Sequence, residues 1–367
     1  MTLSQKVART DTIGPEVERS FAATLSSYLE RGNLATIGFL AFCYFVIGRF
    51  GQHPSSPNHS VTAIWLPAGI SLAALLLRGR RVWPGLYIGA FLLSFSITGS
   101  APIALGLAVG VTSASLAGAH LVNKYANGTK AFFKPRDVLR FIFFGAMLAP
   151  ALCATFGVSL LCLSGYARAT DFFALWVVWW VGDMLGILFL TPFLVLLLGQ
   201  KHQTSGIAEP IEMTVLITGL SMMCVLNFGH RMVTGMPANG LLFLCAPFLV
   251  WSALRFCPLE AAGATLVMGG FALWGSLHGL GPFENLLGLP LFVGAFMAVG
   301  TAMTMVIAAA NAEQKSETKD VLGMYCVLKD VKDGEIRVLQ DTVEALRVEL
   351  ARNGAHRTSG SSQEGVP

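Results

Sequence analysis

The chain has 367 residues, of which 54% are hydrophobic and only 13% are charged, and its mean hydropathy is +0.63. A soluble globule needs more polar surface than this, so the composition excludes an ordinary soluble protein and predicts an integral membrane protein. The formal net charge of +4 says little alone, because the positions of Lys and Arg decide how a membrane protein is oriented.

Residues 1–32 form a polar leader with four basic residues, and it lacks the apolar core and cleavage site of a secretory signal peptide. Apolar residues recur in it at every fourth position: Ile13, Val17, Phe21, Leu25 and Leu29. A helix here would lay a narrow apolar stripe on the inner leaflet. A loosely ordered leader is the alternative.

Ten apolar spans follow the leader, at 34–50, 61–78, 82–98, 101–122, 138–163, 172–198, 211–228, 239–255, 258–276 and 288–310. Most are long enough for a bilayer crossing, which takes ~20 residues as a helix. The pattern predicts an all-α fold, a polytopic transmembrane helix bundle of about ten spans over residues 33–312. Small residues are frequent in several spans and let the helices pack closely.

Basic residues are concentrated in alternate connections between these spans. The richer connections hold Arg78, Arg80, Arg81, Lys124, Lys130, Lys134, Arg136, Lys201 and Arg255. The other connections hold only Arg168 and Arg231, with Arg49 at the end of the first span. By the positive-inside rule the richer connections and both termini are cytoplasmic. Adding or removing one span would break this alternation.

The sixth span, residues 172–198, holds a carboxylate about midway, Asp183. An ionisable group at membrane depth costs at least ~2.5 kcal/mol, so this side chain should face other helices or water. Glycines flank it, two tryptophans precede it by about one helical turn, and Thr191-Pro192 interrupts the helix further on. We therefore expect a bent, closely packed helix that places one polar side chain in the interior of the bundle.

Asp183 is the strongest candidate for a ligand, proton or coupling site, and a structural role bonded to a Ser, Thr or backbone group is the alternative. The nearby tryptophans either wall a pocket or anchor the helices at the membrane interface. The candidate signal-sensing residues are Asp183, Trp179, Trp180, Trp65, Gly182 and Gly186. Six cysteines fall in or at the end of apolar spans without disulfide or zinc spacing, and we interpret them as apolar fillers.

Three further residues are weaker candidates. Arg255 and Glu260 flank the shortest turn, where they pair with each other, contact lipid headgroups or bind a ligand. His278 is one of four histidines expected on the external face, with His53, His59 and His230. They suggest a metal or pH sensor, but they lack helical ligand spacing and isolated loop residues explain them too. We predict no metal site and no cofactor.

The composition changes sharply after Ala310. Residues 313–353 are charged and helix-favouring, and predict a cytoplasmic helix with a short a/d seam formed by Ile336, Leu339, Val343, Leu346 and Leu350. Residues 354–367 are typical of a disordered tail. The roughly 55 residues after the last span are too few for an independent catalytic domain, and they contain no phosphate loop or kinase-like motif. We therefore predict that the chain is not an enzyme.

Several ordered motifs are similar to those of the MASE1 family of membrane-associated sensor domains. They are Ile64–Ile70 (IWLPAGI), Gly79–Gly85 (GRRVWPG), Lys134–Val138 (KPRDV), Trp179–Asp183 (WWVGD) with Gly186 and Thr191-Pro192, Trp274-Gly275, and His278–Phe283 (HGLGPF). The resemblance covers about residues 35–313. Several motifs in one order are more specific than any single motif.

The resemblance implies a sensory input module in the bacterial inner membrane, usually fused to a histidine kinase or a diguanylate cyclase. It therefore implies two-component or cyclic-di-GMP signalling. Because no output domain is expected here, the chain is a stand-alone sensor, a partner of a separate output protein, or a truncated member. Expected partners are membrane lipid and a second copy or a cytoplasmic kinase or cyclase bound through residues 313–353, with no nucleic acid. The alternative is a small-molecule or ion-coupled transporter.

Overall fold

The computed structural model describes residues 31–51, 64–199, 210–229, 243–278, 280 and 288–360. Over these ranges the regular elements are all helices, and no strand occurs. Nearly all of the predicted leader, residues 1–30, lies outside the described residues, as do residues 361–367 of the predicted tail. The chain is therefore an all-α protein in the part that the structure describes.

The α-helices are α3 (Arg31–Phe50), α4 (Leu66–Arg78), α5 (Trp83–Thr98), α6 (Ala101–Tyr125), α7 (Pro135–Phe141), α8 (Ala149–Leu163), α9 (Phe172–Gly199), α10 (Pro210–Phe228), α11 (Ala246–Arg255), α12 (Pro258–Leu277) and α13 (Gly288–Gly360). Short irregular helices join some of them: η1 (Arg80–Val82), η2 (Gly128–Phe133), η4 (Ala169–Asp171) and the π-helical turn η3 (Ile142–Leu148). Each expected apolar span thus contains at least one helix.

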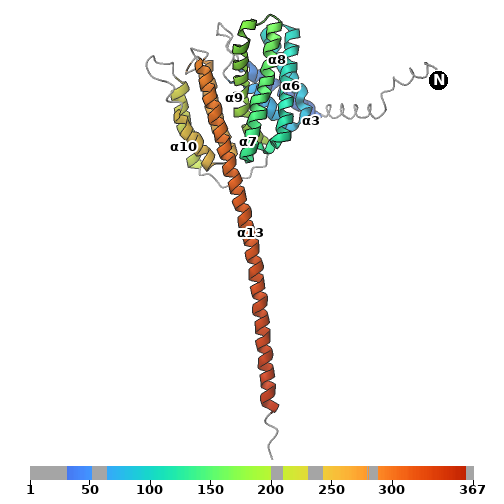
Figure 1. Ribbon diagram of the computed structural model, residues 1–367, viewed down its shortest axis with the longest axis vertical. Helices are drawn as coiled ribbons and strands as arrows, with labels where there is room; N and C mark the ends of the chain where they lie inside the picture. Colours follow the sequence, from blue (N-terminus) through green and yellow to red (C-terminus); the bar gives the residue numbers. More distant parts are fainter. Residues whose placement is uncertain are drawn as a thin grey trace, which may run out of the picture. The chain divides into compact units, whose positions relative to one another are not determined.

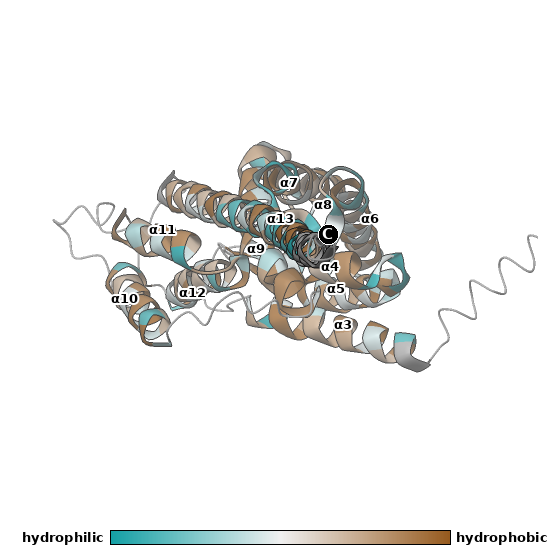
Figure 2. Ribbon diagram, turned by 90° about the horizontal axis from the view of Figure 1, so that it is seen from below, coloured by the Kyte–Doolittle hydropathy of each residue, from teal (hydrophilic) through white to brown (hydrophobic). Residues whose placement is uncertain are grey.

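The helix α9 lies at the centre of the bundle and is the most buried of the long apolar helices. It contacts α4 and α8 on one side and α12 on the other. In Figure 1, α8, α6 and α3 lie to the right of α9. In Figure 2, α10, α11 and α12 are grouped to the left of α9. The position of α9 between these groups places its side chains in the core, which is why its polar residues are of interest.

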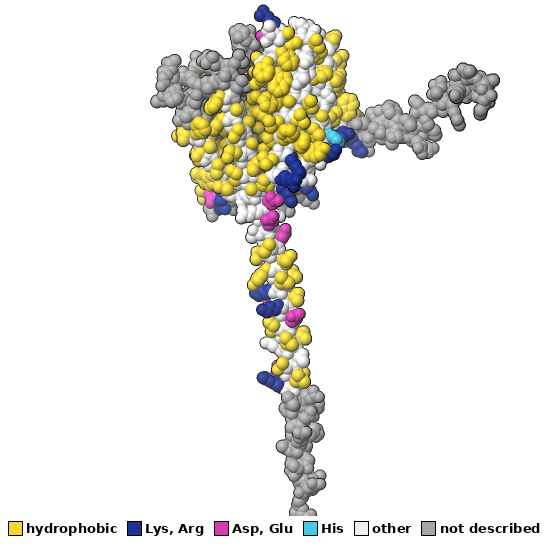
Figure 3. All heavy atoms as spheres, viewed as in Figure 1, with side chains coloured by type: hydrophobic (Ala, Val, Ile, Leu, Met, Phe, Trp, Pro, Cys, Tyr) yellow, Lys and Arg dark blue, Asp and Glu magenta, His cyan; other side chains and the backbone are white. Residues whose placement is uncertain are grey.

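Six helical segments are long and apolar enough to cross a membrane: Asn33–Phe50, Ala101–Tyr125, Pro135–Leu163, Ala169–Gly199, Pro210–Phe228 and Phe292–Arg347. Two shorter apolar helices are Leu66–Arg78 and Phe243–Arg255. Apolar side chains form a broad band on the helical bundle, with Lys and Arg gathered beside one of its edges (Figure 3). These features identify a multi-pass membrane protein.

The second predicted span is shorter in the structure than its apolar run. Residues 61–78 are apolar enough for a crossing, but α4 begins only at Leu66 and has 13 residues. Trp65 is the N-cap residue, outside the helical conformation, and Pro67 stands in the first turn, where the missing N–H of a proline leaves no hydrogen bond unmade. The proline therefore fixes the start of the helix after Trp65.

The chain divides into two compact units, Met1–Ala312 and Glu313–Pro367. The last helix, α13, supplies residues to both, and it continues to Gly360 although the sequence predicts a helix ending at residue 353. No proline follows Pro290 within α13, so its backbone hydrogen-bond ladder is not interrupted. In the second unit, the predicted seam residues Ile336, Leu339, Val343 and Leu346 are all exposed.

Candidate functional site

Helices α4 and α9 approach each other most closely at two glycines. A Cβ atom on Gly186 would overlap the backbone carbonyl of Trp65, and one on Gly69 would overlap the carbonyl of Gly186. Because glycine has no Cβ, the two backbones can touch at this point. The structure therefore brings Trp65 and Gly186, which are far apart in the sequence, into direct contact.

Two hydrogen bonds fasten this crossing. The backbone N–H of Trp65 donates to the carbonyl of Gly182 over 2.9 Å, and the Thr191 hydroxyl donates to the carbonyl of Gly69 over 3.0 Å. Trp65 directly precedes α4, and Thr191 directly precedes Pro192 within α9. The crossing is thus held by hydrogen bonds between the two segments as well as by their close packing.

Asp183 lies on α9 next to this crossing, and only 3% of its surface is exposed. The Cys153 thiol of α8 lies within hydrogen-bonding reach of its carboxylate. Among the residues that the structure describes, no donor lies within hydrogen-bond distance of the other carboxylate oxygen, Oδ1. Asp183 therefore faces neighbouring helices rather than lipid, and one of its oxygens keeps its capacity to accept a hydrogen bond.

Tyr44 of α3 completes the buried polar cluster. Its side chain is 2% exposed, it lies close enough to Asp183 and Cys153 to interact with both electrostatically, and its oxygen accepts a hydrogen bond from the Trp65 indole. The cluster of Tyr44, Trp65, Cys153 and Asp183 thus draws on four separate segments. Such a cluster can hold a proton or accept a donor group of a small ligand.

The tryptophans of α9 face α8. Trp179 packs on Gly157, where a Cβ would come within 2.9 Å of the indole ring. Trp180 donates its indole N–H to the carbonyl of Met147 over 2.9 Å, and Trp176 donates to the Thr155 hydroxyl over the same distance. These contacts make the two candidate tryptophans part of the α8–α9 contact, and Trp176, which is not a sequence candidate, belongs to it as well.

Met147 lies in the π-helical turn η3 that precedes α8. In this turn the Ala149 N–H bonds to the carbonyl of Phe144, five residues back, and Pro150 follows without a backbone donor. Single π-turns are rare and occur frequently at functional sites. The π-helical turn η3 before α8 is therefore hydrogen-bonded to α9 through Trp180, three residues before Asp183.

The weaker candidates lie elsewhere. Arg255 forms a bidentate pair with Glu212 of α10, at 2.7 and 3.2 Å. Sequence spacing does not show this partner, because α10 and the end of α11 meet only in the tertiary structure. Glu260 is in the first turn of α12, and its buried Oε2 has no hydrogen-bond partner within the described ranges.

His278 ends α12 as an exposed residue. Its Nδ1 lies 2.8 Å from the carbonyl of Trp274, and its ring lies 4.9 Å from the ring of Trp274. The other three histidines of the predicted external group lie outside the described residues. In the part of the chain that is described, no group of three or more His, Cys, Asp or Glu side chains could hold a metal ion.

The interpretation of the cysteines as apolar fillers is incomplete. Cys153 contacts Asp183, and Cys224 and Cys245 lie within hydrogen-bonding distance of each other. Sequence spacing could not reveal these contacts, because each joins different helices. For Tyr44 there was a signal, since a phenol within an apolar span brings a polar atom that needs a partner.

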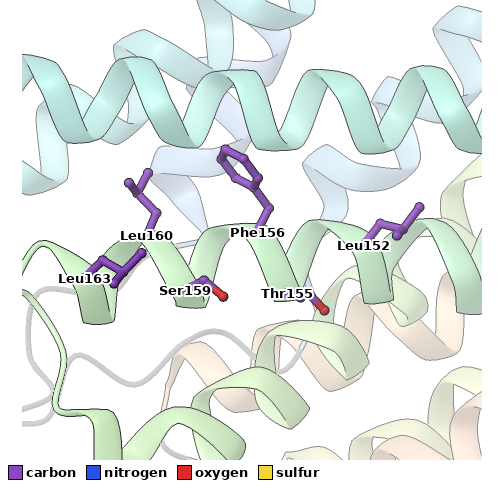
Figure 4. Close-up of a pocket in the computed structure, with 6 residues that line it drawn as sticks. All are labelled: Leu152, Thr155, Phe156, Ser159, Leu160 and Leu163. Atoms are coloured by element: carbon purple, nitrogen blue, oxygen red, sulfur yellow. The ribbon is translucent and has the colours of Figure 1, made fainter.

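A surface groove of about 450 Å³ lies along α8, lined by Leu152, Thr155, Phe156, Ser159, Leu160 and Leu163. Figure 4 shows Phe156 and Leu160 pointing toward the neighbouring helix and Thr155 and Ser159 pointing away from it. Phe156 and Leu160 pack on Gly110 and Gly106 of α6. All six lining residues come from one helix, and Asp183 is not among them, so the groove is separate from the buried polar cluster.

The MASE1 family model matches residues 36–315, which cover α3 to α12 and the first part of α13. No curated protein and no solved structure matches the chain. The matched range contains the crossing of α4 and α9 and the whole buried polar cluster. The chain therefore belongs to the MASE1 family of membrane-associated sensor domains.

Proposed function

We propose that this protein is a sensory input module of the bacterial inner membrane, in which the buried polar cluster around Asp183 detects the signal. The family is one of sensor domains, which supports a membrane sensory role without catalysis. The observation that carries the assignment is the buried carboxylate with one oxygen free of donors among the described residues. Burying such a group costs free energy, and an oxygen without a hydrogen-bond donor does not stabilise the fold in return, so a purely structural role does not account for it.

The signal in this proposal is a proton, a cation or a small molecule with a hydrogen-bond donor. Each would satisfy Oδ1 of Asp183, and each would change the charge or contacts of a group that touches α8 and lies beside α3 and α4. Trp179 and Trp180 hold α8 against α9, so a change at Asp183 can alter how these helices pack. Trp65, Gly182 and Gly186 position the cluster by fixing the crossing of α4 and α9.

The relay to the cytoplasm uses α13. The Asn311 amide donates to the carbonyls of Leu254 and Ala253 at the end of α11, at 2.7 and 3.4 Å. The same helix continues into the second unit, whose exposed apolar residues can pair with a second copy or an output protein. A helix leaving the membrane can transmit a rotation or shift of this kind. Residues 313–353 are thus the proposed contact for a homodimer or for a separate kinase or cyclase.

The proposed orientation has ten spans and two cytoplasmic termini. It is supported by the alternation of basic residues along the sequence and by the ten apolar segments, although four of them fall short of the strict length and hydropathy of a crossing helix. Arg80 and the basic residues near Lys134 would contact anionic headgroups of the inner leaflet. The leader, residues 1–32, would lie on the same side.

The test of the sensing role is the substitution Asp183→Asn. It keeps the shape of the side chain and removes the charge, so a sensing carboxylate predicts a loss of response together with equal or higher stability of the solubilised protein. The full-length chain is purified from its native membrane, and the response is the amount of kinase or cyclase that co-purifies with it. Asp171→Asn is the matched control, because Asp171 is exposed in η4, directly before the same helix. An unchanged response with reduced stability would show a structural role.

A transporter is the alternative, because α9 carries both a buried carboxylate, Asp183, and a proline inside the helix, Pro192, and a gated ion path uses residues of both kinds. The two functions differ in what crosses the membrane. A flux assay in sealed vesicles containing the purified protein separates them: a sensor passes no substrate, whereas a transporter passes its substrate and Asp183→Asn abolishes the flux.

A further inference from the structure

Two cysteines in different helices lie together near one end of the bundle. Cys224 belongs to α10, and Cys245 directly precedes α11. Their side chains lie within hydrogen-bonding distance of each other, and both residues are fully buried. Residues 225–244 separate them in the sequence, so the contact is created by the packing of α10 against α11.

A third residue ties Cys245 to the same part of α10. Asn227, one turn further along α10 than Cys224, directs its amide nitrogen to the Cys245 sulfur at 3.9 Å and to the carbonyl of Met223 at 2.7 Å. Cys245 therefore lies against the turn of α10 that carries Cys224.

The pair lies at the opposite end of α10 and α11 from a salt bridge. Glu212 at the start of α10 pairs with Arg255 at the end of α11, which shows that the two helices run antiparallel. In the proposed orientation, Arg255 is cytoplasmic and the cysteines lie toward the external side. That side of the bacterial inner membrane faces the periplasm, where disulfides form and persist.

We propose that Cys224 and Cys245 form a disulfide bond that joins α10 to the start of α11. The bond forms by exchange with the disulfide of a periplasmic oxidant while the segment folds, before packing buries the sulfurs. The thiolate of one of the two cysteines attacks one sulfur of the oxidant and releases its other sulfur as a thiolate. The second cysteine then loses its proton to water and attacks the first, releasing the remaining sulfur of the oxidant as a thiolate. Two protein thiols lose two electrons, and the oxidant gains them.

This inference rests on the proposed orientation and not on the sensing role of Asp183. The test uses the full-length chain in its native membrane, quenched with acid, denatured, and alkylated with a maleimide with or without prior reduction. The mass of the chain counts the alkylated thiols. We expect five of the seven cysteines to react without reductant and all seven to react after reduction. Alkylation of all seven without reductant would overturn the proposal.

Single substitutions assign the bond. Cys224→Ser and Cys245→Ser should each free the remaining partner, so that every cysteine left in the chain reacts without reductant. Cys153→Ser is the matched control, because Cys153 is also buried but contacts Asp183, and two thiols should stay protected in that variant. Protection that survives Cys224→Ser would assign the bond to other residues and overturn the proposal.

A separate variant tests the orientation on which the inference rests. In Thr234→Cys, a maleimide that cannot cross the inner membrane should label the new thiol from the periplasm. If the new thiol is labelled from the periplasm but all seven native cysteines react without reductant, the disulfide is rejected and the orientation stands. Labelling only from the cytoplasm would reject the orientation and, with it, the oxidising environment that the disulfide needs.

Discussion

Single residues at the crossing of α4 and α9 carry the tightest geometric demand in the bundle. Gly186 faces the carbonyl of Trp65, and Gly69 faces the carbonyl of Gly186. In both cases the obstacle is backbone, which cannot move away as a flexible side chain can. These glycines are therefore required for packing, and they set the position of the neighbouring Asp183.

The corresponding prediction is that Gly186→Ala destabilises the protein. The added methyl group must push α4 away from α9, and overpacking of this kind costs about 1–3 kcal/mol. The free energy of unfolding in detergent, measured from denaturant titrations, tests this. The matched control is Gly270→Ala in α12, where a Cβ meets nothing within 4 Å. Equal stability of the two variants would contradict the close approach of the helices.

The Asp183 cluster shows why residue type alone does not define a site. Cys153 and Tyr44 have no motif around them, and each is the only polar partner that its own helix offers to the cluster in the contacts described. Their role follows from where α8 and α3 place them. A buried carboxylate collects whichever donors the surrounding helices present.

At the scale of elements, the end of α11 is held by another helix rather than by its own cap. The last carbonyls of a helix have no partner within it. In α11 the carbonyls of Ala253 and Leu254 accept hydrogen bonds from Asn311 of α13, while Arg255 pairs with Glu212 of α10. This helix end therefore joins three elements in the first unit.

We expect Asn311→Ala to weaken this junction. It leaves two helix-terminal carbonyls with one donor fewer, and the loss of a hydrogen bond costs about 0.5–1.5 kcal/mol. The unfolding midpoint in detergent measures the loss. Gln314→Ala is the control, since Gln314 is exposed on the same helix. If both variants have the same unfolding midpoint as the wild type, the contact contributes nothing to stability.

At the scale of the whole molecule, the two units differ in what stabilises them. The first unit has an extensive apolar core drawn from α3 to α13. The side chains of residues 314–347 in the second unit are exposed, so they add no burial. The stability of the transmembrane bundle should therefore be independent of the second unit.

Removal of residues 313–367 tests this independence. The shortened chain should insert into the membrane and unfold at the same midpoint as the full chain, because every residue of the buried apolar core belongs to the first unit. Under the proposed function it should also fail to recover a kinase or cyclase. A large fall in the unfolding midpoint would show that the second unit supports the bundle.

The sequence by itself determined the class of the protein, its helical segments and the isolation of Asp183 in an apolar span. These follow from local properties: hydropathy over a window, the positions of proline and glycine, and the cost of a charge in lipid. The WWVGD and IWLPAGI motifs also identified the family that the family model matched.

Only the tertiary structure decided which residues meet. It placed Cys153 and Tyr44 beside Asp183, paired Arg255 with Glu212, and brought Cys224 to Cys245. Each of these contacts joins helices whose order in the sequence says nothing about their neighbours in space. The physical reason is that apolar helices in a bilayer have no preferred partner by hydrophobicity, so shape and a few hydrogen bonds select the packing.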